Sequence, residues 1–395
     1  TDPSLSSAAK ATIVGDLHGL RDLSWLATAY LLTAMVSTPL YGKVSDIRGR
    51  RFSIKIALSC HLAGSLICAL APNMAILILG RVQHGLGGGG LTSTGMVVLG
   101  DVASPKDRAK YYGYFAMIYT TAGACAPALG GFLADYLHWS SIFWLNIPLG
   151  LSALVITLPI MRRLPRHDRP HKLDVLGAAL IVIASVAFML ALTSGGVRYP
   201  WGSPQIIGLF AAAVIFSALF VWRLRTAPEP LIPLSMLKNP VARCAVATNS
   251  LGWGAIVALN IYLPVYLQDV LAMTATSAGL LLMILMGILN ISAGVCSPMI
   301  AKHEHYKTVP LIGLVAALLS VAALAWWAPT MTIWGFELIL LVLGLGFGPL
   351  APLTGVSLQN TVPPYQFGTA VGGMNFLRSL TSTILAGLAC ATMSS

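Results

Sequence analysis

Long apolar stretches separated by short polar breaks recur along the whole chain of 395 residues. A helix needs about 20 mainly apolar residues to cross the hydrocarbon of a bilayer. The stretches are continuous and contain Gly and Pro, whereas strands of a membrane barrel alternate between polar and apolar positions over short segments. The pattern therefore predicts an all-α integral membrane protein with twelve full spans, at Leu23–Tyr41, Ile54–Ala71, Ala75–Gly100, Tyr112–Leu133, Trp139–Ile160, Val175–Leu192, Ile206–Trp222, Val246–Tyr266, Ser277–Ile300, Val309–Trp327, Ile333–Leu353 and Gly368–Cys390.

Composition supports lipid as the main solvent. Hydrophobic residues make up 56% of the chain and charged residues only 9%, against about 25% charged residues in soluble domains. In a soluble protein the net charge of +11 would suggest a nucleic-acid partner. Here it is better explained by loops that face anionic lipid, so we expect a lipid bilayer and no nucleic acid as partner. The polar start, Thr1–Lys10, has no apolar core and does not predict a cleavable signal peptide.

Positive charge is concentrated in alternate loops. Five of them hold 19 of the 24 Lys and Arg residues. Because cationic loops stay on the cytoplasmic side, these five are predicted to face the cytoplasm of a cell whose inner membrane holds the protein. They are Lys43–Lys55, Asp101–Lys110, Met161–Asp174, Arg223–Arg243 and Lys302–Lys307.

Two polar segments divide the chain and enclose a separate pair of helices. The pair, 175–222, lies between a linker at 161–174 and a surface loop at 223–243 that contains Pro228, Pro230 and Pro233. Five predicted spans precede the pair and five follow it, which is a usual plan for a transporter built of two related halves. We therefore predict an N-terminal bundle over 1–160 and a C-terminal bundle over 244–395.

Charges inside spans are candidates for function, because such residues are expensive in lipid. Arg81 lies in LGRVQHGLGGGG, and we interpret it as a residue of a central cavity, the alternative being a structural arginine that extends to the interface. Glu337 is another intramembrane charge, as likely to be structural as functional. The glycines after Arg81 lack the Gly-Lys-Ser/Thr of a phosphate loop, so they predict close helix packing.

The remaining polar residues do not predict catalysis. His61 and His84 have no acidic neighbour one helical turn away and are expected to be hydrogen-bonded packing residues. The six cysteines form no CxxC pair or metal-ligand cluster. We therefore expect no metal, no cofactor and no enzymatic activity. Pro127, Gly130 and Gly131 predict a helix that bends during gating, or alternatively static packing of small residues.

Several segments carry a resemblance to a known family. GKVSDIRGRR (42–51) joins the first two spans, and its spacing of Gly42, Asp46, Gly49, Arg50 and Arg51 is a family signature. Gly42 and Gly49 are expected to allow the two helices to approach closely at this turn. The chain resembles the major facilitator superfamily, in its fourteen-helix drug:proton antiporter branch. Further segments that share the resemblance are LGRVQHGLGGG (79–89), APALGGFLADYLHWSSIFWLNIPLG (126–150), KLDVLG (172–177) and YLPVYLQ (262–268).

This resemblance implies two pseudo-symmetric six-helix bundles joined by the extra central pair. A small-molecule substrate would bind between the bundles near the midplane and be exchanged for protons by alternating access, in a protein that we expect to be monomeric. It also implies that Asp46, Arg50 and Asp101 form a charge cluster that gates the cytoplasmic side, with Asp46 near a helix end of the second bundle.

The ends of the chain depart from the family pattern. Thr1–Leu17 resembles the second half of the family's first helix, with Asp2 at the position of a motif aspartate that binds protons. The family's last helix has no counterpart here. We therefore expect a partial first helix, Asp2 as a proton-binding candidate, and a chain that as given is not competent in proton-coupled antiport. The alternative function is a truncated or non-transporting member that acts as a sensor or remnant.

Overall fold

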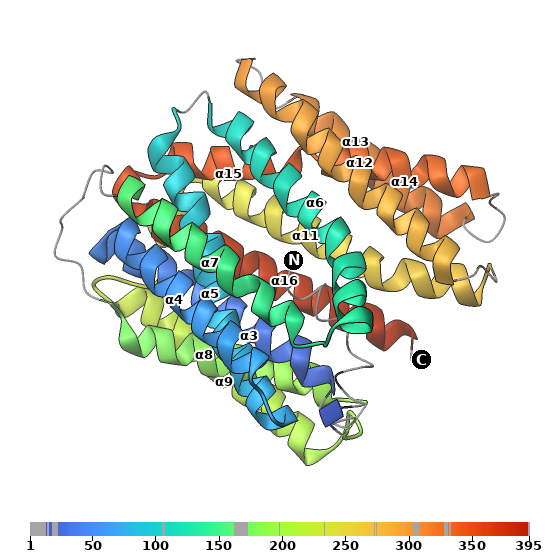
Figure 1. The fold of residues 1–395 in the computed structure, drawn as a ribbon. Helices are drawn as coiled ribbons and strands as arrows, with labels where there is room; N and C mark the ends of the chain where they lie inside the picture. The colour runs from blue at the N-terminus through green and yellow to red at the C-terminus, as the bar shows by residue number, and fades with distance from the viewer. Residues whose placement is uncertain are drawn as a thin grey trace. The chain divides into compact units, whose positions relative to one another are not determined.

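The computed structural model is all-helical in the part of the chain that it describes (Figure 1). That part comprises residue 13 and residues 16–17, 23–104, 107–161, 173–196, 198–232, 234–271, 273, 275–302, 308–327, 331 and 333–393. Asp2 and most of the predicted partial first helix lie outside the described residues, although residues 13, 16 and 17 are helical.

Long helices account for nearly all of the described chain. Their bounds are α3 Leu23–Arg48, α4 Arg50–Ala69, α5 Met74–Val102, α6 Arg108–Tyr136, α7 Ser141–Ile160, α8 Val175–Ser194, α9 Pro204–Thr226, α10 Leu234–Lys238, α11 Pro240–Asp269, α12 Ala275–Lys302, α13 Thr308–Trp327, α14 Ile333–Phe347, α15 Leu350–Thr361 and α16 Phe367–Met393, with a 3-10 turn at Pro364–Gln366. Eleven of the twelve predicted spans coincide with one of these helices each and the twelfth with two of them, so the prediction of an all-α membrane fold is confirmed.

One predicted span is not a single helix. The stretch Ile333–Leu353 was expected to be continuous, but α14 ends at Phe347 and α15 begins at Leu350. The sequence between them is Gly348-Pro349, and a proline inside a helix removes one backbone donor and clashes with the preceding turn. The backbone amide of Gly348 still donates to Gly344 O at 3.1 Å, so the break amounts to a bend.

Seven described segments are long and apolar enough to cross a bilayer by length and composition. They are Arg50–Ala69, Ser141–Ile160, Val175–Ser194, Pro204–Thr226, Pro240–Gln268, Gly279–Ser297 and Trp334–Thr361. A shorter apolar helix covers Leu311–Trp327. Whether all twelve predicted spans cross the bilayer stays a prediction.

The chain divides into two compact units, each assembled from separate stretches. The first unit contains residues 1–102, 125–239 and 362–376, and the second contains residues 103–124, 240–361 and 377–395. Helices α6 and α16 therefore each contribute one part to each unit.

In the first unit, α5 packs closely against both α3 and α4, because α5 carries the glycine run Gly87–Gly90. A Cβ atom on Gly89 would overlap the carbonyl oxygen of Ala34 in α3, and one on Gly87 would overlap the backbone of His61 in α4. The predicted role of these glycines in close packing is thus confirmed. Without a hydrophobic force between helices in lipid, such close approach is what holds a membrane bundle together.

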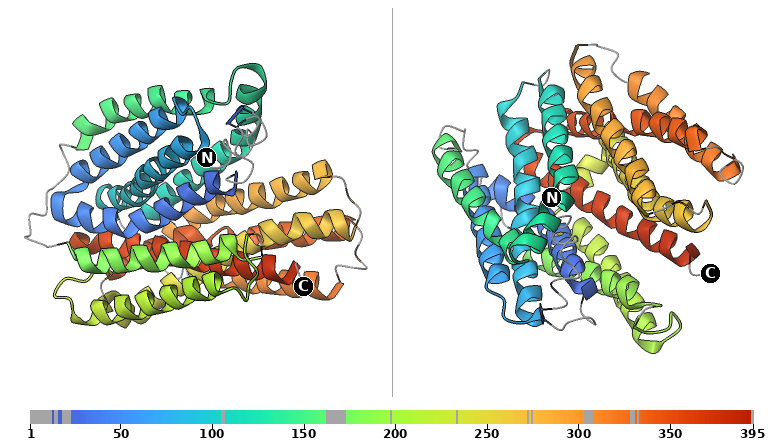
Figure 2. Two further views of the ribbon diagram at one scale, coloured as in Figure 1. Left: turned by 90° about the horizontal axis from the view of Figure 1, so that it is seen from below. Right: turned by 45° about the vertical axis from the view of Figure 1, so that its right-hand side comes forward.

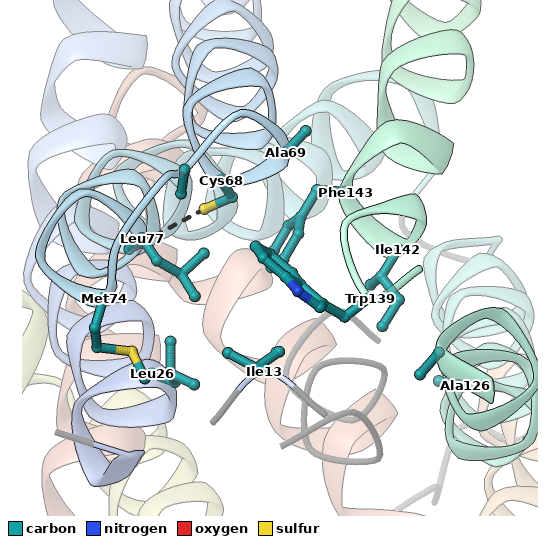
Figure 3. Packing of buried hydrophobic residues seen from close by; sticks show 12 residues of the cluster. Ile13, Leu26, Cys68, Ala69, Met74, Leu77, Ala126, Trp139, Ile142 and Phe143 are labelled. Atoms are coloured by element: carbon teal, nitrogen blue, oxygen red, sulfur yellow. Dashed lines mark hydrogen bonds between the residues drawn. The ribbon is translucent and has the colours of Figure 1, made fainter. Parts of the chain in front are cut away.

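A hydrophobic cluster fills one end of this unit (Figure 3). Trp139, in the turn before α7, and Phe143, in the first turn of α7, point toward Leu77 of α5 and Ile13. The thiol of Cys68 in α4 donates to the carbonyl oxygen of Leu77 at 3.7 Å, drawn as the dashed line in Figure 3. The cysteine is therefore a small packing residue, as its apolar surroundings predicted.

The extra helix pair also belongs to the first unit. Helices α8 and α9 run antiparallel and side by side (Figures 1 and 2). The side chain of Asp174 accepts from the backbone amide of Gly177 and so caps α8. It also accepts from Nε of Arg223, in the last turn of α9, at 3.0 Å. The Asp174 carboxylate thus joins the beginning of α8 to the end of α9.

In the second unit, α11 to α14 pack around a hydrophobic cluster of their own. Leu285 of α12, together with Leu340 and Leu343 of α14, is almost fully buried there. Gly346 of α14 and Gly313 of α13 have no room for a Cβ because each faces the other's backbone. The same device of glycine contacts is therefore used in both units.

Glycine packing predicts opposite effects for one substitution at two helical sites. Gly89→Ala should destabilise the protein by about 1–3 kcal/mol, because the added Cβ overlaps α3. Gly208→Ala, in α9, has open space around the new Cβ and should be neutral or stabilise by up to about 1 kcal/mol. Thermal unfolding in detergent, followed by size-exclusion fluorescence, measures both. Equal melting temperatures for the two variants would contradict the packing described here.

Candidate functional site

Arg50, the first residue of α4, is the centre of a buried ionic cluster. Its Nε donates to Asp101 Oδ2 at 2.7 Å, and its Nη1 lies 2.5 Å from Asp46 Oδ1. The remaining donors reach Ser45 Oγ and the carbonyl oxygen of Pro364, each at 3.2 Å. We call Asp46, Arg50 and Asp101 the Arg50 cluster. The sequence predicted that these three side chains meet, and the structure brings them together.

The Asp46 carboxylate also binds the beginning of α16. The backbone amides of Gly368 and Thr369 donate to it at 3.0 and 2.7 Å, and the Thr369 hydroxyl donates at 2.5 Å. The first amides of a helix have no acceptor within the helix, and the helix dipole places partial positive charge there. Asp46 is therefore an N-terminal cap supplied from more than 300 residues away.

The charges of the cluster balance only when α16 is included. Two carboxylates face one guanidinium, all of them almost fully buried. The partial positive charge at the start of α16 and the donor groups of Gly368 and Thr369 compensate the remaining negative charge. Removing one member of a buried pair of this kind costs about 3–5 kcal/mol, because the other charge stays behind without compensation.

Two glycines make this arrangement possible, in different ways. Gly42 of α3 has no room for a Cβ, because the backbone of Gly368 lies against it. Gly49 separates α3 from α4 with φ = 85°, a conformation that side chains other than glycine disfavour. We expected both glycines to allow close approach. For Gly49 this is wrong, since nothing lies within 4 Å of a Cβ there, and its role is to let the chain turn.

The segment that follows the extra helix pair packs onto the same region. Glu229 forms an ion pair with Lys43 at 3.3 Å. Leu231 and Ile232 are 0% and 4% exposed, and Ile232 lies against Gly373 of α16. The predicted surface loop at 223–243 is thus partly a buried connection.

Arg81, in the second turn of α5, has no exposed surface. Its Nε donates to the carbonyl oxygen of Leu26 at 2.9 Å, and its guanidinium lies over the Tyr30 ring, 4.6 Å from the centroid. The alternative in which Arg81 extends to the interface is therefore wrong for this structure. Protein atoms enclose the side chain on all sides, and this arrangement does not test the predicted place of Arg81 in a central cavity. That place stays a prediction.

The histidines next to Arg81 are hydrogen-bonded, as predicted. His84 Nε2 lies 3.1 Å from both Ser65 Oγ and His61 Nε2. The two rings are 4.0 Å apart between centroids, and His84 is fully buried.

The other predicted residues lie apart from the Arg50 cluster or carry no described contact. Arg51 is half-buried in the first turn of α4, Glu337 is half-buried in the second turn of α14, and Gly130 is buried in α6. Pro127 and Gly131 also lie in α6, although the surroundings of their side-chain positions are outside the description. Their predicted roles in gating and proton coupling remain predictions.

Several residues of the site have no signal in the sequence. Pro364, Gly368, Thr369 and Glu229 are ordinary polar or turn residues until the fold places them beside α3. In the second unit, Arg108 had been counted only as a loop cation, yet it is buried and its Nη1 donates to Asn360 Oδ1 at 2.9 Å.

Comparison with known proteins agrees with this architecture. Residues 4–386 match the family described as Major Facilitator Superfamily. The chain is 32% identical over 391 residues to a protein of Bacillus subtilis named multidrug transporter protein MdtP, which covers 97% of this chain and 70% of that one. It is 31% identical over 385 residues to multidrug resistance protein 3 of the same organism, covering 97% and 74%.

The fold also matches a solved transporter structure. A bacterial homologue of the iron transporter ferroportin superposes with a TM-score of 0.68 at 14% identity, over all of this chain and 89% of that one. At this identity the likeness concerns the fold alone. The curated relatives are longer, and the chain spans between 53% and 74% of their length. Because the family match covers almost the whole of this chain, the chain belongs to the Major Facilitator Superfamily and is a multi-pass membrane protein of that fold.

Proposed function

We propose that this protein exports lipophilic drugs or other small amphipathic molecules in exchange for protons, as a member of the fourteen-helix drug:proton antiporter branch. The extra pair α8–α9, which follows the fifth predicted span, supports that branch. Relatives named as multidrug transporters, about 30% identical over almost the whole chain, support the substrate class.

One observation carries the mechanism. The Arg50 cluster binds the start of α16 through hydrogen bonds from Gly368 and Thr369 to the Asp46 carboxylate. A polar contact of this kind is directional and is lost outright when its groups separate, so it suits an interface that opens and closes. We infer that Asp46, Arg50 and Asp101, with Gly368 and Thr369, form a latch that favours one state of an alternating-access cycle.

The latch acts by a population shift. A transporter must visit both states, so the latch can favour one of them by only a few kcal/mol. Gly42 and Gly49 belong to the latch as the residues that permit its geometry, and Arg51 as a cation on the same turn. The positive charge of the loop at Lys43–Lys55 supports a position of this end of α3 at the cytoplasmic face of the inner membrane. Pro127, Gly130 and Gly131 give α6 the flexibility to follow the movement.

Transport by the purified chain tests the proposal directly. In proteoliposomes with an internal pH dye, an outward-directed gradient of ethidium should move protons inward through the wild-type protein. A lipophilic anion, tested in the same way as the cation ethidium, shows which substrate charge the protein prefers. Protein-free liposomes give the leak. If no probe of either charge moves against protons above this leak, proton-coupled drug export is refuted.

Loss of one latch charge should free the start of α16. In Asp46→Asn, the amides of Gly368 and Thr369 lose a charged acceptor, so their hydrogen exchange should accelerate by about tenfold or more. Asp107→Asn, which changes an exposed aspartate, is the matched control and should leave the exchange unchanged. Hydrogen–deuterium exchange of the peptide that covers residues 367–376 measures the effect. Identical exchange in Asp46→Asn and wild type would refute the latch.

The proposed orientation can be tested at the two ends of α9. In a cysteine-free background, Gly202→Cys should react with an impermeant maleimide on intact cells, because it is exposed in the loop predicted to lie outside. Thr226→Cys, equally exposed at the last residue of α9, should react only after permeabilisation. The reverse labelling pattern would overturn the orientation.

A further inference from the structure

We propose that His61 and His84 form a proton-binding pair inside the membrane, whose occupancy is coupled to the position of Arg81. This inference rests on the proposed proton coupling and names a site for it. It starts from a feature that packing alone does not require, namely two imidazole rings whose Nε2 atoms lie 3.1 Å apart in the interior of a helix bundle.

The predicted span Ala75–Gly100 would place the pair near the middle of the membrane. His84 is ten residues from Met74, the first residue of α5, and a helix rises 1.5 Å per residue, so it lies about 15 Å along the axis. The hydrocarbon core is about 30 Å thick. Substrate and ion sites of transporters with two related halves lie at this depth.

The neighbours of His84 determine where its proton lies. Nη1 of Arg81 is 3.4 Å from His84 Nδ1, and a guanidinium can only donate. His84 Nδ1 must therefore present its lone pair, and the proton of the neutral ring lies on Nε2. That proton is shared with His61 Nε2 or Ser65 Oγ, both at 3.1 Å. Since two facing lone pairs would repel, one proton lies between the two rings.

Uptake of one more proton changes this arrangement in a defined way. The neutral pair carries two N–H groups, and the protonated pair carries three. With one proton kept between the two Nε2 atoms, both Nδ1 atoms must then carry a proton. His84 Nδ1–H would face the donating Nη1 of Arg81, next to a second positive charge. Protonation of the pair and the contact between Arg81 and His84 therefore exclude each other.

Displacement of Arg81 acts on α3. Arg81 donates to Leu26 O and lies over the ring of Tyr30, both in α3, and the same helix carries Asp46 near its other end. A proton at the pair thus weakens the contacts between α5 and α3, and its release restores them. The proton enters from water on one side of the membrane and leaves to the other, so the pair returns to two N–H groups in each cycle.

The described surroundings hold no other group that would take the proton instead. The titratable or charged side chains that face His84 are Arg81 from α5, His61 from α4 and Tyr30 from α3, whose ring meets His84 edge-on at 5.6 Å. Helix α7 contributes Phe143, which does not titrate. Among these described neighbours, Arg81 already carries its proton and the rings of Tyr30 and Phe143 are not bases, so a further proton at this place goes to the histidine pair.

Spectroscopy on the wild-type protein tests proton binding, with variants used only to assign the resonances and as a control. With 15N-labelled histidine, the resonances of the pair should change from the neutral to the cationic form between about pH 5 and 8. Single His61→Gln and His84→Gln variants assign these two among the eight histidines, and His138→Gln, at an exposed residue, is the matched control. A pair that stays neutral across this range while His138 titrates would overturn the proposal.

Transport then separates proton coupling from a structural role. In proteoliposomes, His84→Gln and His61→Gln should retain exchange of ethidium for ethidium, whereas proton-driven uptake should fall by about tenfold or more. His138→Gln should keep both activities. Normal proton-driven uptake by His84→Gln would overturn the proposal. A titrating pair in a wild-type protein that moves no protons would instead refute the proposed function and leave the binding site standing.

Discussion

Lipid offers no partner for backbone N–H and C=O groups, and this constraint shapes the structure at every level. Each segment that crosses the hydrocarbon must satisfy its backbone within itself, which makes it a helix. The helices gain little from burying apolar side chains against one another, so they rely on close approach. Gly87 and Gly89 of α5, which leave no room for a Cβ, are the clearest expression of this requirement.

The same constraint explains where the polar groups are. A charge inside the bundle must find compensation from the protein, and each described case does so differently. Arg50 is compensated by two carboxylates, whereas Asp46 also uses the unpaired amides at the start of α16. Arg81 relies on a carbonyl oxygen, an aromatic face and a histidine. The contacts of Arg50 and Asp46 link segments that are far apart in the sequence. The contacts of Arg81 lie within the neighbouring helices α3 and α5.

Sequence reasoning recovered the helices well because an apolar run of about 20 residues has a single interpretation in lipid. It failed at Gly348-Pro349, where the hydropathy stays high across a break in the helix. The resemblance to the family predicted that Asp46, Arg50 and Asp101 meet, although Asp101 lies 51 residues after Arg50. It could not find Thr369 or Glu229, since a backbone amide at a helix start leaves no trace in composition. The His61–His84 contact was also invisible, because the crossing of α4 and α5 determines which residues face each other.

The burial of Leu231 and Ile232 has a consequence for protein engineering. The stretch between α9 and α11 contains Pro228, Pro230 and Pro233 and reads as an exposed connector, the usual choice for a reporter, an epitope tag or a protease site. Two of its residues are instead enclosed within the bundle. An insertion beside them would pull apolar side chains away from α16, so tags belong at the exposed turn around Gly202 instead.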